Sequence, residues 1–173
     1  PYQSRFLDTW TLLAALAGQT ERVRLFPDVV NLPLRPPAML AKAAASLDVM
    51  SGGRIELGLG AGAFWEGIHA MGGEKRTPGQ AVSALEEAIH VIRLLWSGQR
   101  GSRFDGEFYQ LRGVHSGPTP AHDMGIWLGA YGPRMLALTG RLADGWVPSS
   151  SYAPPGKLAE MQARIDDAAA EAG

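Results

Sequence analysis

The chain has 173 residues, of which 46% are hydrophobic and 19% are charged, and its formal net charge is −1 at pH 7. This composition is typical of a folded globular protein, and the near-neutral charge gives no general attraction to nucleic acid or to an anionic membrane surface. The sequence has no cysteine, which excludes disulfides, thiolate metal sites and cysteine nucleophiles.

The length fits one domain with a substantial core, so we expect a single domain over residues 1–173. No apolar run approaches the roughly 20 residues that a membrane-spanning helix needs. The apolar segment Thr9–Gly18 ends like a signal peptide, but Asp8 precedes it and it has no basic lead-in. We interpret it as a core-facing helix and expect a cytoplasmic protein.

The first half of the chain alternates apolar segments with turns. Phe6, Trp10 and Leu13, followed by Leu16 or Ala17, fall on one face at helical spacing. The elements expected here are a helix over Phe6–Ala17, a strand over Val23–Val30, a helix over Ala38–Met50, a strand over Arg54–Gly60 and a loop over Ala61–Gly79.

The second half opens with the longest predicted helix, which Thr77 caps and Pro78 begins. The elements expected here are a helix to about Trp96, a hairpin over Ser102–Leu111, a strand over Gly125–Gly129, a helix over Arg134–Ala143, a strand over Gly145–Val147 and a helix over Leu158–Ala172. The regular alternation predicts an α/β fold with a parallel sheet, either half of a (β/α)₈ barrel or a small open sheet.

Ligands of parallel α/β proteins bind beyond the carboxyl ends of the strands. Four segments at the predicted ends are rich in glycine, proline or small polar residues: Pro27–Asn31, Gly58–Gly62, Gly129–Pro133 and Trp146–Ser151. This concentration at one edge favours a ligand cleft over four unrelated turns.

Two of these segments have a possible phosphate-binding pattern. Gly58–Ala63 matches the relaxed dinucleotide fingerprint G-x-G-x-x-A, but no helix is expected through Ala61–Gly79 and no acidic residue follows within Thr77–Ser83, so we reject an NAD site. Gly129–Pro133 joins a strand to a helix N-terminus, where free N–H groups favour an anion. An ordinary βα turn is the alternative.

Side chains offer few catalytic candidates. The four histidines are scattered without metal-ligand spacing, and no metal site is expected. We interpret His69 as solvated and Glu87, on the long helix, as contributing only to solubility. Phe64, Trp65 and Tyr131 could wall an aromatic cofactor or fill core. No acid, base or nucleophile is assigned.

Five segments carry a resemblance to a known family: Leu32–Ala38, Ser46–Arg54, Leu57–Gly62, Gly129–Pro133 and Ala143–Trp146. Their ordered series resembles the bacterial-luciferase-like superfamily of flavin- and deazaflavin-dependent oxidoreductases, the luciferase-like monooxygenases. The form of Gly129–Leu136 is similar to the branch that uses the deazaflavin coenzyme F420 rather than FMN. The resemblance implies a TIM-type (β/α)₈ barrel with the cofactor at its C-terminal mouth.

By this resemblance, three groups of residues would hold the cofactor: the bulge at Asp28 and Val29, the ring-facing Gly60, Ala61 and Gly62, and the phosphate-facing Gly129, Ala130 and Gly132. A non-prolyl cis peptide is expected between Asp28 and Val29. The implied activity is hydride transfer between coenzyme F420, or FMN, and a small-molecule organic substrate. With reduced FMN, the resemblance implies that the same fold would activate oxygen as a monooxygenase.

The departures from the family are equally specific. A full barrel has about eight βα units, and we expect this chain to begin after the second strand and to end before the seventh, so that the usual Asp-His pair would precede Pro1. Ala63 stands where some relatives carry a carboxylate.

Four units would leave open sheet edges and an apolar interior, so we expect a homo-oligomer. The alternative function is a non-catalytic flavin-binding or structural half-barrel that self-associates.

Overall fold

The computed structural model of the protein describes residues 6–173. Its central sheet has four strands in the order β1-β2-β5-β6, and all neighbouring pairs are parallel. The strands are β1 (Val30–Asn31), β2 (Leu57–Gly60), β5 (Ile126–Leu128) and β6 (Gly145–Trp146). The parallel α/β architecture predicted from the alternation of elements is confirmed.

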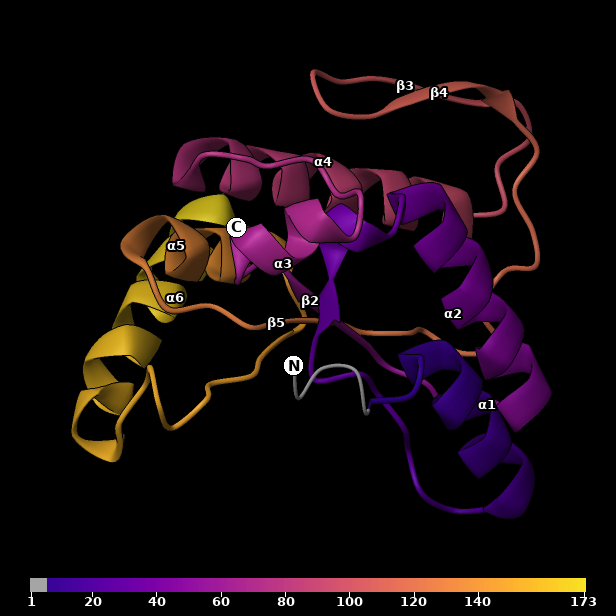
Figure 1. Ribbon diagram of the computed structural model, residues 1–173, viewed down its shortest axis with the longest axis horizontal. Coiled ribbons are helices and arrows are strands. Elements are labelled where there is room, and N and C mark those ends of the chain that lie inside the picture. The colour runs from indigo at the N-terminus through magenta and orange to yellow at the C-terminus, as the bar shows by residue number, and fades with distance from the viewer. Residues whose placement is uncertain (1–5) are drawn as a thin grey trace.

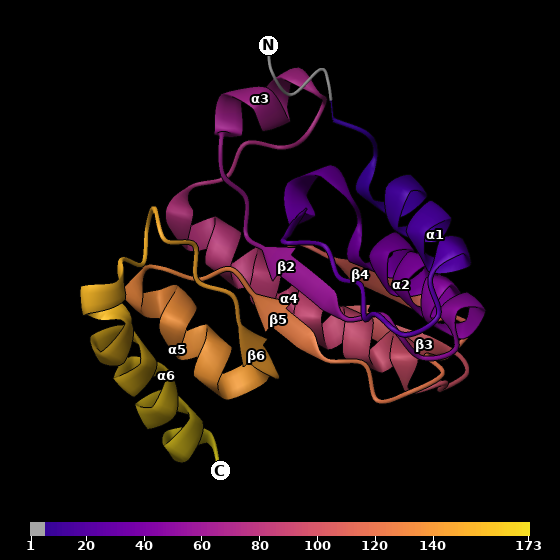
Figure 2. The ribbon, with the colours of Figure 1, turned by 90° about the horizontal axis from the view of Figure 1, so that it is seen from below.

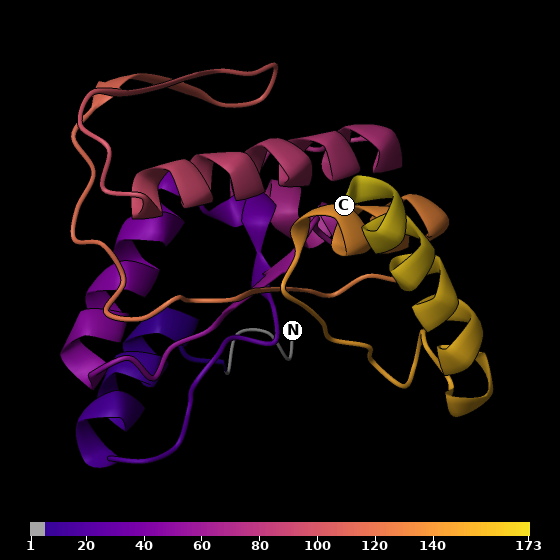
Figure 3. The same cartoon turned by 180° about the vertical axis from the view of Figure 1, so that it is seen from behind.

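Helices connect these strands and lie around the sheet. They are α1 (Thr9–Gln19), α2 (Pro37–Ser51), α3 (Trp65–Ala70), α4 (Pro78–Trp96), α5 (Pro133–Leu142) and α6 (Leu158–Ala172), with short 3₁₀ turns at Leu32–Leu34 and Pro155–Lys157. In the view of Figure 1, α1 and α2 lie to the right of the strands, α5 and α6 lie to the left, and α4 runs across above them. Figure 3 shows the same arrangement from behind.

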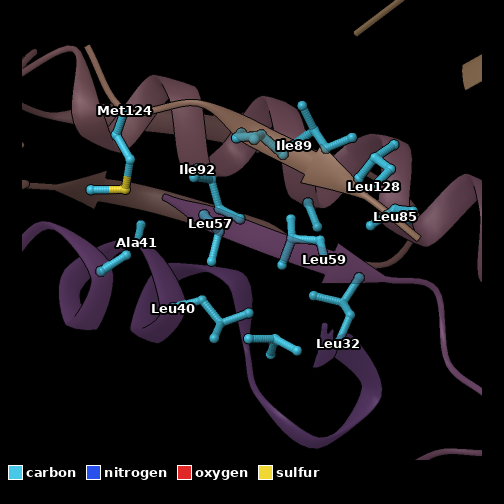
Figure 4. Close-up of a cluster of buried hydrophobic side chains, with 14 of the residues drawn as sticks. Leu32, Leu40, Ala41, Leu57, Leu59, Leu85, Ile89, Ile92, Met124 and Leu128 are labelled. Carbon is cyan, nitrogen blue, oxygen red and sulfur yellow. The ribbon is translucent and has the colours of Figure 1, made fainter. Parts of the chain in front are cut away.

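The core fills the space between the sheet and helices α2 and α4 (Figure 4). Leu57 and Leu59 of β2 point into it and are fully buried, because alternate residues of a strand share a face. Leu85 and Ile89 of α4 meet them from the helix side and are also fully buried. Burial of such side chains, at roughly 1.5–3 kcal/mol each, fixes the sheet against the helices.

The intervening residues of the strands face the other side of the sheet. A Cβ atom on Gly58 of β2 would collide there with the carbonyl oxygen of Pro27 and lie 3.2 Å from Phe26 Cδ2. The rings of Phe26 and Trp127 lie 6.4 Å apart between centroids. These two aromatic side chains are 41% and 37% exposed. In Figure 2 β2, β5 and β6 lie side by side with the helices arranged around their outer side. The sheet therefore has one face covered by helices and one face with exposed aromatic residues.

The predicted first helix and first strand need correction. The helix starts at Thr9, where the Asp8 carboxylate caps it by accepting a hydrogen bond from Thr11 N, and Phe6 lies outside it, 76% exposed. The predicted strand over Val23–Val30 was wrong. Only Leu25 pairs there, with Ile55, before the two-residue β1, because Pro27 cannot donate a hydrogen bond to a ladder.

The segment Ala61–Gly79 was predicted as a loop but contains α3. Phe64 enters this helix in a left-handed conformation, with φ of 57°, and Ile68 anchors it in the core. Of the five glycines in the segment only Gly67 lies within this helix, so the glycine content of the whole segment concealed it. The next helix, α4, has the predicted limits, and Thr77 and Gln80 cap it reciprocally.

The predicted hairpin is confirmed as β3 (Ser102–Asp105) paired antiparallel with β4 (Gln110–Val114). It projects over α4 (Figure 1). The Glu87 carboxylate fastens its tip by accepting hydrogen bonds from the backbone N–H groups of Glu107, Phe108 and Tyr109, at 2.8, 2.9 and 3.0 Å. The interpretation of Glu87 as a solubility residue was therefore wrong. Nothing in the sequence indicated this role, because the partners of Glu87 lie some twenty positions further along the chain.

A buried carboxylate joins the segments that precede β2 and β5. Asp48, fully buried at the end of α2, accepts hydrogen bonds from the backbone N–H groups of Ile55 at 3.1 Å, Ala121 at 2.8 Å and His122 at 3.3 Å. Its Oδ2 also lies 3.0 Å from Nδ1 of His122. The segment Ser46–Arg54 thus stabilises the end of the sheet opposite to the carboxyl ends of the strands.

Within residues 6–173 no helix combines the length and the apolar character that are needed to cross a membrane.

Candidate functional site

A cavity of about 390 Å³ lies at the carboxyl ends of β1, β2 and β5. Its lining comes from four segments that are far apart in the sequence. The lining residues are Val29, Val30, Asn31, Gly60, Ala61, Gly62, Ala63, Phe64, Gly129, Tyr131, Gly132, Met135 and Tyr152. The strand ends therefore meet at one shared mouth, as the parallel topology predicts.

Most of the proposed cofactor residues lie at this mouth. The residues that line the cavity are Val29, Gly60, Ala61, Gly62, Gly129 and Gly132. Asp28 is exposed and is not part of the lining. Ala130 is fully buried beneath the cavity, where its carbonyl oxygen accepts a hydrogen bond of 2.9 Å from Nε1 of Trp146.

Val29 lies between two glycines of neighbouring strand ends. A Cβ atom on Gly60 would come within 2.9 Å of Val29 Cγ2, and one on Gly129 within 3.3 Å. The peptide bond between Asp28 and Val29 is cis, as the sequence resemblance predicted. The side chain of Val29 and the bare backbone of the two glycines form the floor of the cavity.

The rim on the β2 side depends on Gly62. Its φ is +115°, a conformation that side chains rarely adopt, and a Cβ atom there would lie 2.9 Å from both Pro33 Cγ and the ring of Trp65. Glycine is therefore required at this point for two independent reasons. The close packing holds the start of α3 against the mouth of the cavity.

Aromatic side chains wall the outer part of the cavity. Phe64 and Tyr131, which the sequence left open between cofactor wall and core, both line it. Tyr152 stacks on Tyr131 with ring centroids 4.9 Å apart. Tyr152 was missed, because it lies in a Ser/Pro-rich loop without periodicity. Trp65 lines an adjoining cavity instead.

That second cavity, of about 440 Å³, shares Ala61, Gly62, Gly132 and Met135 with the first. It lies between the beginnings of α4 and α5, where Pro78 and Pro133 are the first helical residues. The first N–H groups of a helix have no partner within it and favour negative charge. Arg134, exposed at the start of α5, also lines this cavity.

The described lining of the 390 Å³ cavity has no charged side chain and no histidine. His69 and Glu66 are exposed on α3 and do not line it. Its polar side chains are two tyrosines and Asn31. The Oδ1 atom of Asn31 is buried and has no hydrogen-bond partner among the described residues. Sequence reasoning missed Asn31, although a lone amide between Val30 and Leu32 at a strand end is an available signal.

The family described as luciferase-like monooxygenase matches residues 1–173. The chain belongs to this family. The resemblance stated from its sequence segments is therefore confirmed, and the parallel sheet corresponds to part of a luciferase-like TIM barrel.

Three known proteins are similar to this chain, one in sequence and two in structure. A phthiodiolone/phenolphthiodiolone dimycocerosates ketoreductase from Mycobacterium kansasii is 38% identical over 175 residues, which cover 96% of this chain and 45% of that protein. An F420-dependent secondary alcohol dehydrogenase in complex with an F420–acetone adduct has a TM-score of 0.88 at 24% identity, over 96% of this chain and 50% of the other. Riboflavin lyase with modified FMN and riboflavin has a TM-score of 0.84 at 20% identity, over 95% and 41%.

The chain spans about half the length of the curated relatives that it matches, with 56% coverage of an uncharacterized protein from Mycobacterium tuberculosis and 45% coverage of the ketoreductase. The part of the relatives that this chain matches includes the ends of β1, β2 and β5, which form the cavity.

Proposed function

We propose that the protein is an oxidoreductase that uses coenzyme F420, or alternatively FMN, to exchange a hydride with a small organic substrate. The observation that carries this proposal is the 390 Å³ cavity at the carboxyl ends of three parallel strands. Membership in a family of oxidoreductases and monooxygenases gives the reaction class.

The residues present fit a flat ring system. Gly60 and Gly129 bring bare backbone to the cavity floor on either side of Val29, and a Cβ atom on Gly60 would collide with that valine. Backbone without Cβ atoms allows the close approach of a planar ligand. Phe64 and Tyr131 supply aromatic surface for the upper part of the site.

In this proposal the protein positions the reactants and excludes water. Bound F420 or FMN supplies the hydride chemistry. Gly60, Ala61 and Gly62 would hold the ring, and Gly129 and Gly132, with Ala130 buried behind them, would hold the phosphate-bearing part near the beginning of α5. The described lining holds no carboxylate, histidine or lysine, and the hydroxyl groups of Tyr131 and Tyr152 are its side-chain groups that could exchange a proton with substrate.

Two considerations favour F420 and a ketone or secondary alcohol as its substrate. The segment Gly129–Leu136 resembles the deazaflavin branch. The names of two similar proteins concern a ketoreductase and an F420-dependent secondary alcohol dehydrogenase. The FMN alternative is supported by the similar riboflavin lyase, which was crystallised with modified FMN.

The test is a titration of the purified protein with F420 and with FMN, followed by ligand fluorescence. The preferred cofactor is then supplied in its reduced form with a panel of ketones, and its oxidation is followed by absorbance. We expect saturable binding and substrate-dependent oxidation. Gly156→Ala is a suitable control variant, because a Cβ atom at Gly156 would meet nothing within 4 Å.

The same titration separates this proposal from the alternative function. Saturable binding without oxidation across the panel would favour a non-catalytic flavin-binding half-barrel. Failure of both cofactors to bind at millimolar concentration would contradict the proposed function altogether.

A further inference from the structure

Asn31 is the one amide side chain in the lining of the candidate cofactor cavity. It ends β1, where it stands opposite Gly60 in the parallel register. Val30 and Leu32 on either side of it are buried in the core. Asn31 itself lines the cavity, as do Val29 and Val30 before it.

The carbonyl oxygen of this amide is unsatisfied among the described residues. Oδ1 of Asn31 is buried, and no described residue donates a hydrogen bond to it. A buried acceptor without a donor costs roughly 1–3 kcal/mol. The cost is removed if a ligand in the cavity presents an N–H or O–H group at this depth.

We propose, on the basis of the proposed function, that the Asn31 carboxamide hydrogen-bonds the imide edge of the cofactor ring. Flavins and deazaflavins both carry a ring N–H group, N3–H, between two carbonyl groups. A carboxamide matches such an edge, because its oxygen accepts from the N–H while its NH₂ group donates to a neighbouring carbonyl.

The chemistry of the orphaned atom separates this assignment from a contact to substrate. A ketone has only an acceptor oxygen and leaves Oδ1 unpaired, and a secondary alcohol can donate one hydrogen bond to Oδ1 through its single O–H, whereas the imide edge donates to Oδ1 and also accepts from the NH₂ group. The other polar side chains of the lining, Tyr131 and Tyr152, stack on each other through their rings at the rim. Asn31 is therefore a cofactor-binding and orienting residue, which the family assignment alone does not supply.

The test replaces Asn31 by Leu, which keeps the volume and removes both hydrogen-bonding groups. We expect the Kd of the cofactor preferred by the wild type to rise about tenfold, the loss expected for a pair of buried hydrogen bonds. Asn31→Asp keeps the shape but replaces the donor by a carboxylate oxygen, so we expect at least the same loss. Gln162→Leu, the same chemical change on the exposed face of α6, is the matched control.

Two further readouts distinguish a ligand contact from a structural role. An N3-methylated form of the same cofactor should bind about tenfold more weakly than the parent to the wild type, but equally with the parent to Asn31→Leu. The thermal midpoint of the cofactor-free variant should be unchanged or higher, because its unpaired buried amide is gone.

The outcomes separate the two proposals. If neither cofactor binds the wild type, the proposed function fails and the assignment of Asn31 fails with it. If the parent cofactor binds the wild type and Asn31→Leu equally well, or if N3-methylation weakens binding to both proteins by the same factor, the proposed function stands and the assignment of Asn31 is wrong.

Discussion

Val29 Cγ2 lies 2.9 Å from the point that a Cβ atom on Gly60 would occupy. Val29 immediately precedes β1 and Gly60 ends the neighbouring parallel strand β2, and both residues line the same cavity. The valine therefore fills the space that a side chain on β2 would need. The glycine, in turn, keeps the backbone of the cavity floor accessible from above.

This relationship predicts the effect of Gly60→Ala. The added methyl group must displace the Val29 side chain toward the cavity, so we expect the cofactor Kd to rise tenfold or more. The measurement is the fluorescence titration described above. Gly156→Ala, where a Cβ atom meets nothing within 4 Å, should leave the Kd unchanged.

A compensating substitution makes the prediction specific. Val29→Ala removes the methyl groups that the new Cβ would meet, and in the double variant it should recover part of the lost affinity. If the double variant binds no better than Gly60→Ala alone, the steric explanation is wrong.

A second prediction concerns Asp48, which is fully buried and accepts three backbone hydrogen bonds. Asp48→Ala would leave these N–H groups without a partner, and we expect the free energy of unfolding to fall by about 3 kcal/mol or more. Urea denaturation followed by circular dichroism measures the change. Asp123→Ala, at an exposed site, is the control and should change the stability by less than about 0.5 kcal/mol. A similar small loss for Asp48→Ala would contradict the structural role of this carboxylate.

The sequence was most informative where the determinants of structure are local. The limits of α4 follow from Thr77 and Pro78, and those of α6 follow from its apolar spacing. The convergence of Gly60 and Gly129 at one mouth followed from the parallel topology, because equivalent strand ends share an edge of the sheet.

Contacts between residues that are far apart in the sequence could not be predicted from the sequence. Asp48 and His122 are 74 positions apart, and nothing near either residue indicates the other. Glu87 similarly resembles any solvated helix residue until the hairpin is in place. The burial of Asn31 Oδ1 and its lack of a described hydrogen-bond partner became visible only in the structure.

A third prediction follows from the environment of His122. Burial lowers the pKa of this histidine, but hydrogen bonds and negative charge from Asp48, and then from Glu56, outweigh burial and raise its pKa above the usual 6.5. Arg24, which pairs with Glu56, is the other charged group of this cluster. Because the folded state binds the proton more tightly than the unfolded state, the stabilisation is fully present below about pH 6.5 and is lost as the pH rises through the folded-state pKa.

The free energy of unfolding, measured by urea denaturation between pH 6 and pH 8, should show this loss. Other titrating groups also change the stability over this range, so the contribution of His122 is read from the difference between the wild type and a variant. His122→Gln keeps hydrogen-bonding capacity but cannot be protonated, so its stability should change less with pH over this range. His90→Gln, on an exposed face of α4, should retain the pH dependence of the wild type. Equal slopes for the wild type and His122→Gln would show that His122 does not contribute.

The fourth prediction concerns the sheet face opposite the helices. Phe26 and Trp127 are 41% and 37% exposed there, and β1 and β6 form the two edges of the described sheet. Exposed aromatic surface and unpaired edges favour association. We propose that a second copy of the chain covers this face and expect a dimer or larger assembly by light scattering.

Phe26→Lys should shift the equilibrium toward monomer because burial of an unpaired ammonium group is costly, whereas Gln162→Lys on α6 should not. A monodisperse wild-type monomer at micromolar concentration would contradict this proposal.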